Sequence, residues 1–164
     1  MSLPGTKPWG GVDIINVIEI ACHKVSGGNA QGEALVTLEP ISFLGTVDPG
    51  TGKVIDPKHE LYGRCVAGKV LLFPGGKGST VGSYVIYQLK KRGVAPAAMV
   101  NLKSEPIVAV GAIISGIPLV DRVPSSLLKV EVGTRMVVDA DKGILKAYLK
   151  APSADRDLWS EKTF

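Results

Sequence analysis

Hydrophobic positions along the chain recur at two different periods, and these periods predict strands and helices in alternation. Short runs rich in β-branched and aliphatic residues, bounded by Gly, Pro, Asn or Asp, are typical of strands. Apolar positions at helical spacing instead predict one helix over residues 81–92 and a second, more apolar helix over residues 106–115. The expected strands are residues 14–25, 33–38, 69–73, 97–101, 117–120, 135–139 and 144–148.

The order of these elements predicts an α/β fold. Strands come first, then strand–helix–strand–helix–strand, then a hairpin closed by a glycine-containing turn. Parallel strands in the middle with antiparallel strands outside indicate a three-layer β/β/α domain, which is not doubly wound because only two crossover helices are available. We expect a flexible N-terminal arm at residues 1–11, the β/β/α domain at 12–150 and a polar C-terminal tail at 151–164. Residues 42–62 predict a long loop, of the kind that is often functional.

The bulk composition fits one globular subunit and excludes several classes of partner. The 164 residues are 45% hydrophobic and 21% charged, so one ordered core is expected. The net charge of +4 comes without clustered basic and aromatic residues, which argues against nucleic-acid binding. The chain has no apolar run of about 18 residues and no apolar segment at its start, so we expect no membrane span and a cytoplasmic location.

The candidate metal ligands are too few and too scattered to build a site. Cys22 and Cys65 form no CxxC motif, and two separate cysteines do not complete a zinc or iron–sulfur site. Asp48, Asp56 and His59 resemble a loose metal triad, but Asp beside Pro or Gly is ordinary turn chemistry. We therefore expect no metal site within this chain and two reduced thiols.

A glycine-rich segment, residues 75–83, carries the clearest chemical signal. Three glycines within four residues allow positive φ and a close approach of the backbone to a ligand. The following helix would offer free N–H groups and its positive dipole end, so the segment predicts an anion site for a carboxylate or a phosphate. Ser79 or Thr80 is expected at the N-cap, and a role as a cap alone is the alternative for Ser79. A Walker A loop is excluded because Gly78 follows Lys77 where Ser or Thr is required.

Residues 73–84, Phe-Pro-Gly-Gly-Lys-Gly-Ser-Thr-Val-Gly-Ser-Tyr, resemble the signature of the small subunit, or swivel domain, of the aconitase X family. The resemblance covers roughly residues 25–148. It implies a swivelling β/β/α domain related to the mobile domain of aconitase, and a hydro-lyase that is active only as a heterodimer. It also implies that the large subunit holds an iron–sulfur cluster, with none bound by this chain alone. Further segments that carry the resemblance are residues 32–36, 39–45, 47–49, 51–52, 55–56, 95–98 and 111–113, together with His59.

The same resemblance assigns roles to residues of the glycine-rich segment. Ser79 matches the family's catalytic serine, which as an alkoxide would take the proton α to a carboxylate while the metal centre helps the hydroxyl leave. Serine is a poor base at neutral pH, and the field of an anion site beside a helix N-terminus has the right sign to activate it. For Lys77 the alternative is a solvated loop lysine, and for Thr80 and Ser83 it is helix capping. The expected substrate-binding residues are Gly76, Lys77, Gly78, Thr80 and Ser83.

Two branches of the family differ in substrate. Residues 78–85 with 88–91 look like the branch that dehydrates (R)-5-phosphomevalonate to trans-anhydromevalonate 5-phosphate in the mevalonate pathway of isoprenoid biosynthesis. The other branch acts on cis-3-hydroxy-L-proline and more often has Arg in place of Lys77. An alternative of another class is a non-catalytic swivelling binding or carrier module, by analogy of fold alone. A carrier would need a phosphorylatable histidine on an exposed loop, for which His59 is the candidate.

Overall fold

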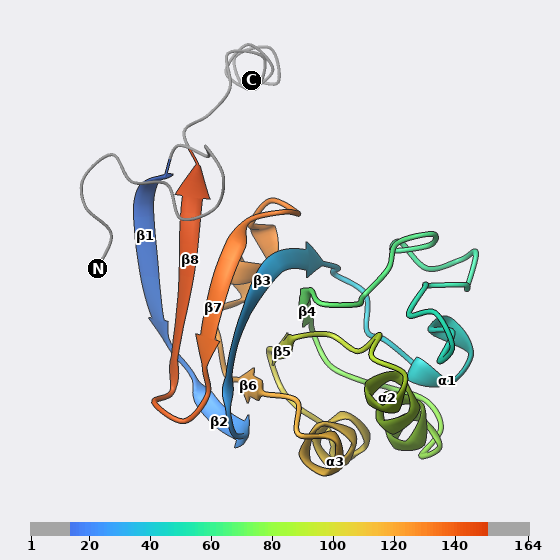
Figure 1. Ribbon diagram of the computed structural model, residues 1–164. Coiled ribbons are helices and arrows are strands. Elements are labelled where there is room, and N and C mark those ends of the chain that lie inside the picture. Colours follow the sequence, from blue (N-terminus) through green and yellow to red (C-terminus); the bar gives the residue numbers. More distant parts are fainter. Residues whose placement is uncertain (1–13, 151–164) are drawn as a thin grey trace, which may run out of the picture.

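The strands form one mixed sheet in the order β1-β8-β7-β3-β4-β5-β6-β2 in the computed structural model, which describes residues 14–150 (Figure 1). The predicted arm and tail lie outside the described residues. The strands are β1 (Ile14–Ala21), β2 (His23–Ser26), β3 (Asn29–Val36), β4 (Val70–Phe73), β5 (Ala98–Asn101), β6 (Leu119–Asp121), β7 (Arg135–Asp139) and β8 (Ile144–Lys150). The helices are α1 (Phe43–Thr46), α2 (Gly82–Lys91) and α3 (Pro106–Ser115), with a 3-10 helix η1 (Ser125–Lys129).

The sheet bends so that it supplies two of the three layers, which confirms the expected β/β/α arrangement. Strands β3 to β6 pair in parallel, and β2, β7, β8 and β1 pair antiparallel around them. Helices α2 and α3 lie side by side against one face of the parallel strands (Figure 1). The core between helices and sheet includes Leu71, Phe73, Ile86, Leu89 and Met99, and the core between the two halves of the sheet includes Leu72, Val100, Met136, Val138 and Leu145.

Strand β4 shows why the middle strands carry unbroken apolar runs. Leu71 and Phe73 belong to the core under the helices, whereas Val70 and Leu72 belong to the core between the sheet halves. Both faces of the strand are therefore buried, as is usual for parallel strands, and no polar alternation is expected.

The strand predicted at residues 14–25 is two strands, and this prediction is wrong in detail. The strand breaks at Cys22, where β1 leaves its pairing with β8 and β2 begins to pair with β6 at the other edge of the sheet. The Cys22 N–H donates to Gly143 O at 2.9 Å, so the break is held by the β7–β8 turn. The β-branched residues of this segment favour both strands, but they do not indicate that the pairing changes from β8 to β6.

The two long helices form where apolar periodicity predicts them. Helix α3 starts with Pro106 after Glu105, whose carboxylate accepts the N–H groups of Ile107 and Val108 at 2.9 and 2.7 Å. Helix α2 ends at Lys91 with Arg92 as its C-cap, and Gly93 follows with φ +73°, as expected for a C-terminal cap.

Candidate functional site

The glycine-rich segment leaves the carboxyl end of β4 and packs beside residues 40–42 before it reaches α2. Ile41 N–H donates to Gly75 O, and Lys77 N–H donates to Ile41 O, both at 3.1 Å. Gly75 is buried, whereas residues 77–81 are exposed. The first half of the segment is therefore part of the packed domain, and its second half is available to a ligand.

Close packing gives the glycines of this segment a structural reason. A Cβ on Gly75 would lie 2.8 Å from Lys103 O. A Cβ on Gly76 would overlap the Glu105 carboxylate, and one on Gly78, which also has φ +89°, would overlap the Ser42 hydroxyl. The fold already requires these glycines, so a role of the glycine run in ligand binding stays a prediction.

We predict that Gly76→Ala lowers the free energy of unfolding by about 1–3 kcal/mol, the usual cost of overpacking. The new methyl group would displace Glu105 from the start of α3, where it holds two N–H groups. Thermal denaturation of Gly76→Ala, Glu105→Ala and the double variant measures this. The double variant should lose less stability than the sum of the single variants, because both changes release the same contact. Additive losses would contradict it.

The start of α2 differs from the prediction in its capping. The N-cap is Val81 without a side-chain cap, so the assignment of Ser79 or Thr80 to this position is wrong. Ser79 Oγ instead accepts the N–H of Val81 at 3.1 Å, and Ser79 O accepts the N–H of Gly82 at 2.9 Å. The tight turn before the helix thereby satisfies the first helical N–H groups, which were expected to be free.

Three other N–H groups are free instead. Within residues 14–150, no acceptor binds the backbone N–H of Gly78, Ser79 or Thr80. Consecutive N–H groups without partners at an exposed glycine turn suit a carboxylate or phosphate oxygen. The predicted anion site thus has a structural basis in the loop, one turn earlier than the helix start.

The predicted site residues fall into two groups. Lys77, Ser79 and Thr80 are exposed, and no carboxylate in the described part of the chain forms an ion pair with Lys77. Gly76 contacts Glu105 of the α3 cap, and the Ser83 hydroxyl donates to Thr80 O at 3.0 Å. The geometry therefore leaves the side chains of Lys77, Ser79 and Thr80 for a ligand, while Gly76 and Ser83 are engaged in holding the loop.

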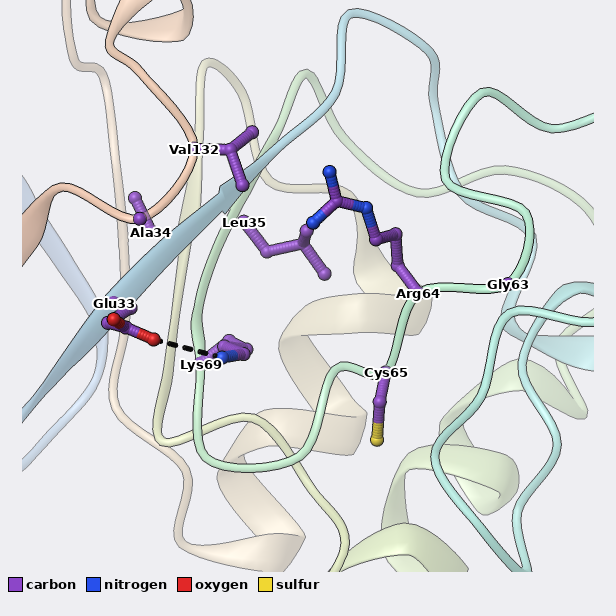
Figure 2. Close-up of a pocket in the computed structure, with 9 residues that line it drawn as sticks. Glu33, Ala34, Leu35, Gly63, Arg64, Cys65, Lys69 and Val132 are labelled. Carbon is purple, nitrogen blue, oxygen red and sulfur yellow. Dashed lines mark hydrogen bonds and ion pairs between the residues drawn. The ribbon is translucent and has the colours of Figure 1, made fainter.

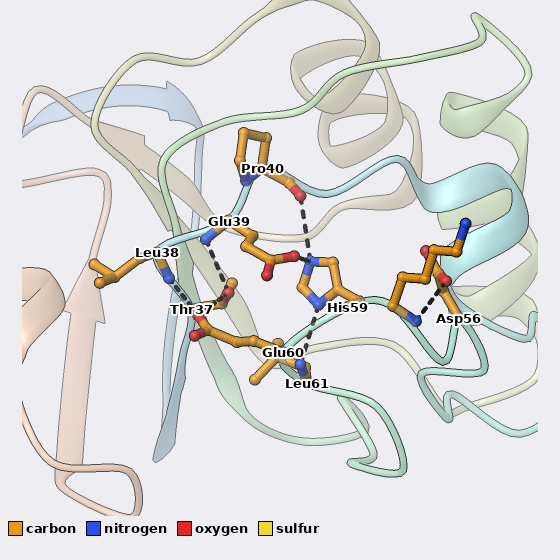
Figure 3. A network of polar contacts seen from close by, with 9 residues as sticks. Thr37, Leu38, Glu39, Pro40, Asp56, His59, Glu60 and Leu61 are labelled. Carbon is orange, nitrogen blue, oxygen red and sulfur yellow. Dashed lines mark hydrogen bonds and ion pairs between the residues drawn. The ribbon is translucent and has the colours of Figure 1, made fainter.

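Ser42 is a neighbour of this loop that sequence reasoning missed. Its hydroxyl lies against Gly78 and donates to Leu44 O at 3.1 Å. The segment before it is held by His59, whose Nε2 donates to Pro40 O at 3.2 Å while Nδ1 accepts the N–H of Leu61 at 3.1 Å (Figure 3). These partners place a proton on Nε2, which also lies 3.6 Å from Glu39 Oε2. In the sequence, the polar residues of the long loop pointed to this region, but no neighbouring residue indicated which groups they contact.

The network also involves Glu60, which ties the long loop to the end of β3. Its carboxylate accepts the Thr37 hydroxyl and the N–H of Leu38 (Figure 3). The Thr37 hydroxyl, and then the Leu38 N–H, lower the pKa of Glu60.

A pH dependence of stability follows from this contact. The folded-state pKa of Glu60 is depressed, so its stabilising contribution is present above the pKa of the unfolded state and is lost as the pH falls through the folded value. We expect the melting temperature of wild type to exceed that of Glu60→Gln by a constant amount above about pH 5 and by less below pH 4. Thermal melts from pH 3 to 7 measure this, and a gap that widens towards low pH would contradict it.

The three loop residues considered as a metal triad have other roles. Asp48 accepts Gly50 N–H and the Thr51 hydroxyl, and Asp56 accepts Lys58 N–H, so both close turns. Among residues 14–150 no group of three His, Cys, Asp or Glu side chains is placed to hold a metal ion. Burial, and then Asp121, raise the pKa of the Cys22 thiol to about 11, so it is protonated at neutral pH.

A cavity of about 450 Å³ lies elsewhere, between β3 and the turns at residues 63–65 and 132–133 (Figure 2). Lys69 and Glu33 form an ion pair of 3.2 Å in its wall, and the exposed Cys65 lines it. None of the predicted site residues lines this cavity. No helix in the described part of the chain is long and apolar enough to cross a membrane.

Comparison with known proteins gives one consistent result. A family described as "Aconitase X swivel domain" matches residues 19–147. A curated relative, the phosphomevalonate dehydratase small subunit of Methanothrix thermoacetophila, is 74% identical over 78% of this chain and 93% of its own length. The protein of the same name from Methanocella arvoryzae is 61% identical over 79% of this chain and 98% of its own length.

Solved structures agree in fold and in extent. Aconitase X of Thermococcus kodakaraensis in its holo form is similar with a TM-score of 0.77 and 50% identity, over 80% of this chain and 99% of that chain. A solution structure described as a UPF0107 protein is similar with a TM-score of 0.73 and 50% identity, over 80% of this chain and all of its own. The swivel-domain fold expected from the resemblance is confirmed.

Proposed function

The chain belongs to the aconitase X swivel domain family, and from this membership we propose that it is the small subunit of a phosphomevalonate dehydratase, a hydro-lyase of the mevalonate pathway. The observation that carries the proposal within the structure is the exposed Ser79 hydroxyl beside three backbone N–H groups without acceptors. Removal of a proton from the carbon next to a carboxylate requires a base and a nearby site that binds the anion, and both lie within one turn of this loop.

Ser79 is the proposed general base. As an alkoxide it would remove the proton on the carbon α to the carboxylate of (R)-5-phosphomevalonate, and loss of the neighbouring hydroxyl as water would leave the double bond of trans-anhydromevalonate 5-phosphate. The Val81 N–H that donates to Ser79 Oγ at 3.1 Å stabilises the alkoxide relative to the hydroxyl, because a donor strengthens its bond to a charged acceptor. The N–H groups of residues 78–80 and the Lys77 ammonium would bind the carboxylate or the phosphate.

A large subunit is required in this proposal. The residues described here do not fit an iron–sulfur cluster, so the cluster of the family would be held entirely by the large subunit. Lys77 is assigned to anion binding in this proposal, so the remaining proton transfers would also belong to that subunit. The complex is proposed to be cytoplasmic, where reduced thiols are expected.

The carrier alternative loses its candidate residue. His59 is 7% exposed and both of its ring nitrogens are engaged by the backbone of neighbouring loops. Phosphorylation would require this side chain to leave its place under Pro40. The alternative substrate, cis-3-hydroxy-L-proline, is also chemically compatible with the anion site. An activity assay decides between the two substrates.

The proposal is tested by purifying the chain alone, the large subunit alone and the co-expressed complex. We expect a heterodimer by size-exclusion chromatography, and turnover of (R)-5-phosphomevalonate by the complex only. Turnover by the chain alone at the rate of the complex would overturn the two-subunit proposal. Turnover of cis-3-hydroxy-L-proline without turnover of phosphomevalonate would overturn the choice of substrate.

A further inference from the structure

Apart from the buried Ser115 at its last position, helix α3 is apolar throughout, including the side that faces away from the domain. Its inner face contains Val108, Gly111 and Ala112, which are buried against α2 and the sheet. The opposite face, which we call the outer face of α3, consists of Pro106, Val110, Ile113 and Ile114, all exposed, and the helix contains no charged residue. Val110, Ile113 and Ile114 expose 48%, 56% and 55% of their surface. A surface helix normally turns polar residues outward, and a helix that is apolar all round is normally covered.

The first turns of α3 lie close to the glycine loop through α2. A Cβ on Gly111 would lie 3.2 Å from Ser83 Cα, and a Cβ on Gly82 would lie 3.1 Å from Ile107 Cγ2, so the first turn of α2 packs closely on α3. Figure 1 shows the two helices next to each other on this side of the sheet.

More exposed apolar side chains lie at the start of α2 and on the neighbouring α1. Val81 and Tyr84 are 47% and 57% exposed on the first turn of α2, and Leu44 of α1 is 45% exposed. The Leu44 backbone is within 4 Å of the Cβ position of Gly82. Apolar surface thus continues from the edge of the proposed active site onto α3.

We propose that the outer face of α3, together with Leu44, Val81 and Tyr84, is the surface on which the large subunit docks. The inference rests on the proposed function. Ser79 has to meet a substrate bound by the other subunit, so the surface around the glycine loop faces that subunit, and the apolar surface is continuous with it. A second copy of this chain on the same surface would cover the approach to Ser79. The large subunit must present uncharged, apolar side chains here, because α3 offers no partner to a buried charge.

The experiment compares Val110→Glu/Ile113→Glu with a matched control, Val17→Glu/Val132→Glu. The control also places two glutamates at half-exposed valines, each 45% exposed, on β1 and in the turn before β7. Dissociation constants for the holo large subunit are measured by sedimentation, and kcat is measured with each variant at saturation. A milder variant, Ile113→Ala/Ile114→Ala, keeps the test valid if the glutamates impair folding.

We expect the α3 double glutamate variant to bind the large subunit roughly 30-fold or more weakly, as for residues at the centre of an interface, and the control to bind as wild type does. At saturation kcat should return to the wild-type value, because α3 contributes no reacting group. Binding by both α3 variants that equals wild type, with wild type binding well, would overturn the docking surface alone. Failure of wild type to bind the large subunit would overturn the proposed function as well.

Two further outcomes would assign this face to another occupant. A wild-type chain that is dimeric alone and becomes monomeric in the α3 variant, with unchanged binding to the large subunit, would show contact between copies. A fall in melting temperature of the isolated α3 variant but not of the control, again with unchanged binding, would show that the chain itself covers the face. Either result would overturn the proposal.

Discussion

Ser79→Ala is expected to lower kcat of the complex by about 10²–10⁴-fold, the usual effect of losing a positioned general base. The fold and the heterodimer should be unaffected, because the Ser79 side chain is exposed and accepts one hydrogen bond, from Val81 N–H. Steady-state kinetics with (R)-5-phosphomevalonate, together with size-exclusion chromatography and a thermal melt, measure the three quantities separately. Thr80→Ala is the control, since it removes an adjacent exposed hydroxyl and should change kcat far less.

The competing role for Ser79 makes a different prediction. If its hydroxyl serves the turn before α2 alone, Ser79→Ala loses one hydrogen bond and lowers the free energy of unfolding by about 0.5–1.5 kcal/mol. A folded complex that keeps most of its kcat and has a lower melting temperature would leave Ser79 as a structural residue. Proton transfer would then belong to the large subunit.

Lys77→Met is expected to lower kcat/KM for (R)-5-phosphomevalonate by about 10–100-fold, which corresponds to the loss of one charged hydrogen bond of about 1.5–3 kcal/mol. Its ammonium forms no ion pair in the described part of the chain, so the change should have little effect on stability. Because binding of a phosphate remote from the reacting carbon is equally strong in ground and transition states, most of the effect should be in KM.

Two variants control for the charge. Lys77→Arg should keep part of the activity, because it preserves a cation at the loop. Lys90→Met removes a charge near the other end of α2 and should leave kcat/KM within about twofold of the wild-type value. This comparison separates the effect of a direct contact with the substrate from the effect of the net charge. An unchanged kcat/KM in Lys77→Met would identify this residue as a solvated loop lysine and leave anion binding to the backbone N–H groups.

The pattern of apolar and turn residues was sufficient to predict those elements that are defined by a single stretch of chain. The apolar runs at β4 and β5, the helical spacing in α2 and α3, and the glycine turn of the final hairpin each depend on residues within one or two turns of one another. The glycine-rich segment and Ser79 were identified in the same way, and the resemblance of residues 73–84 led to the family that the comparisons show. The order of the elements then determined how they stack in layers, because strand–helix–strand connections between parallel strands allow few topologies.

Contacts between distant segments decided the rest. The break at Cys22 depends on which strand each half pairs with, and the requirement for Gly78 depends on Ser42, which lies 36 positions earlier. The backbone N–H groups without an acceptor belong to residues 78–80, one turn before the predicted position at the start of α2. The first N–H groups of α2 are not free, because the Ser79 and Thr80 carbonyl oxygens accept them. The apolar periodicity of α3 predicted a helix but not an exposed face, since exposure depends on what the fold places against each side. Hydrogen-bond partners and burial are properties of the assembled layers, whereas periodicity is a property of the chain.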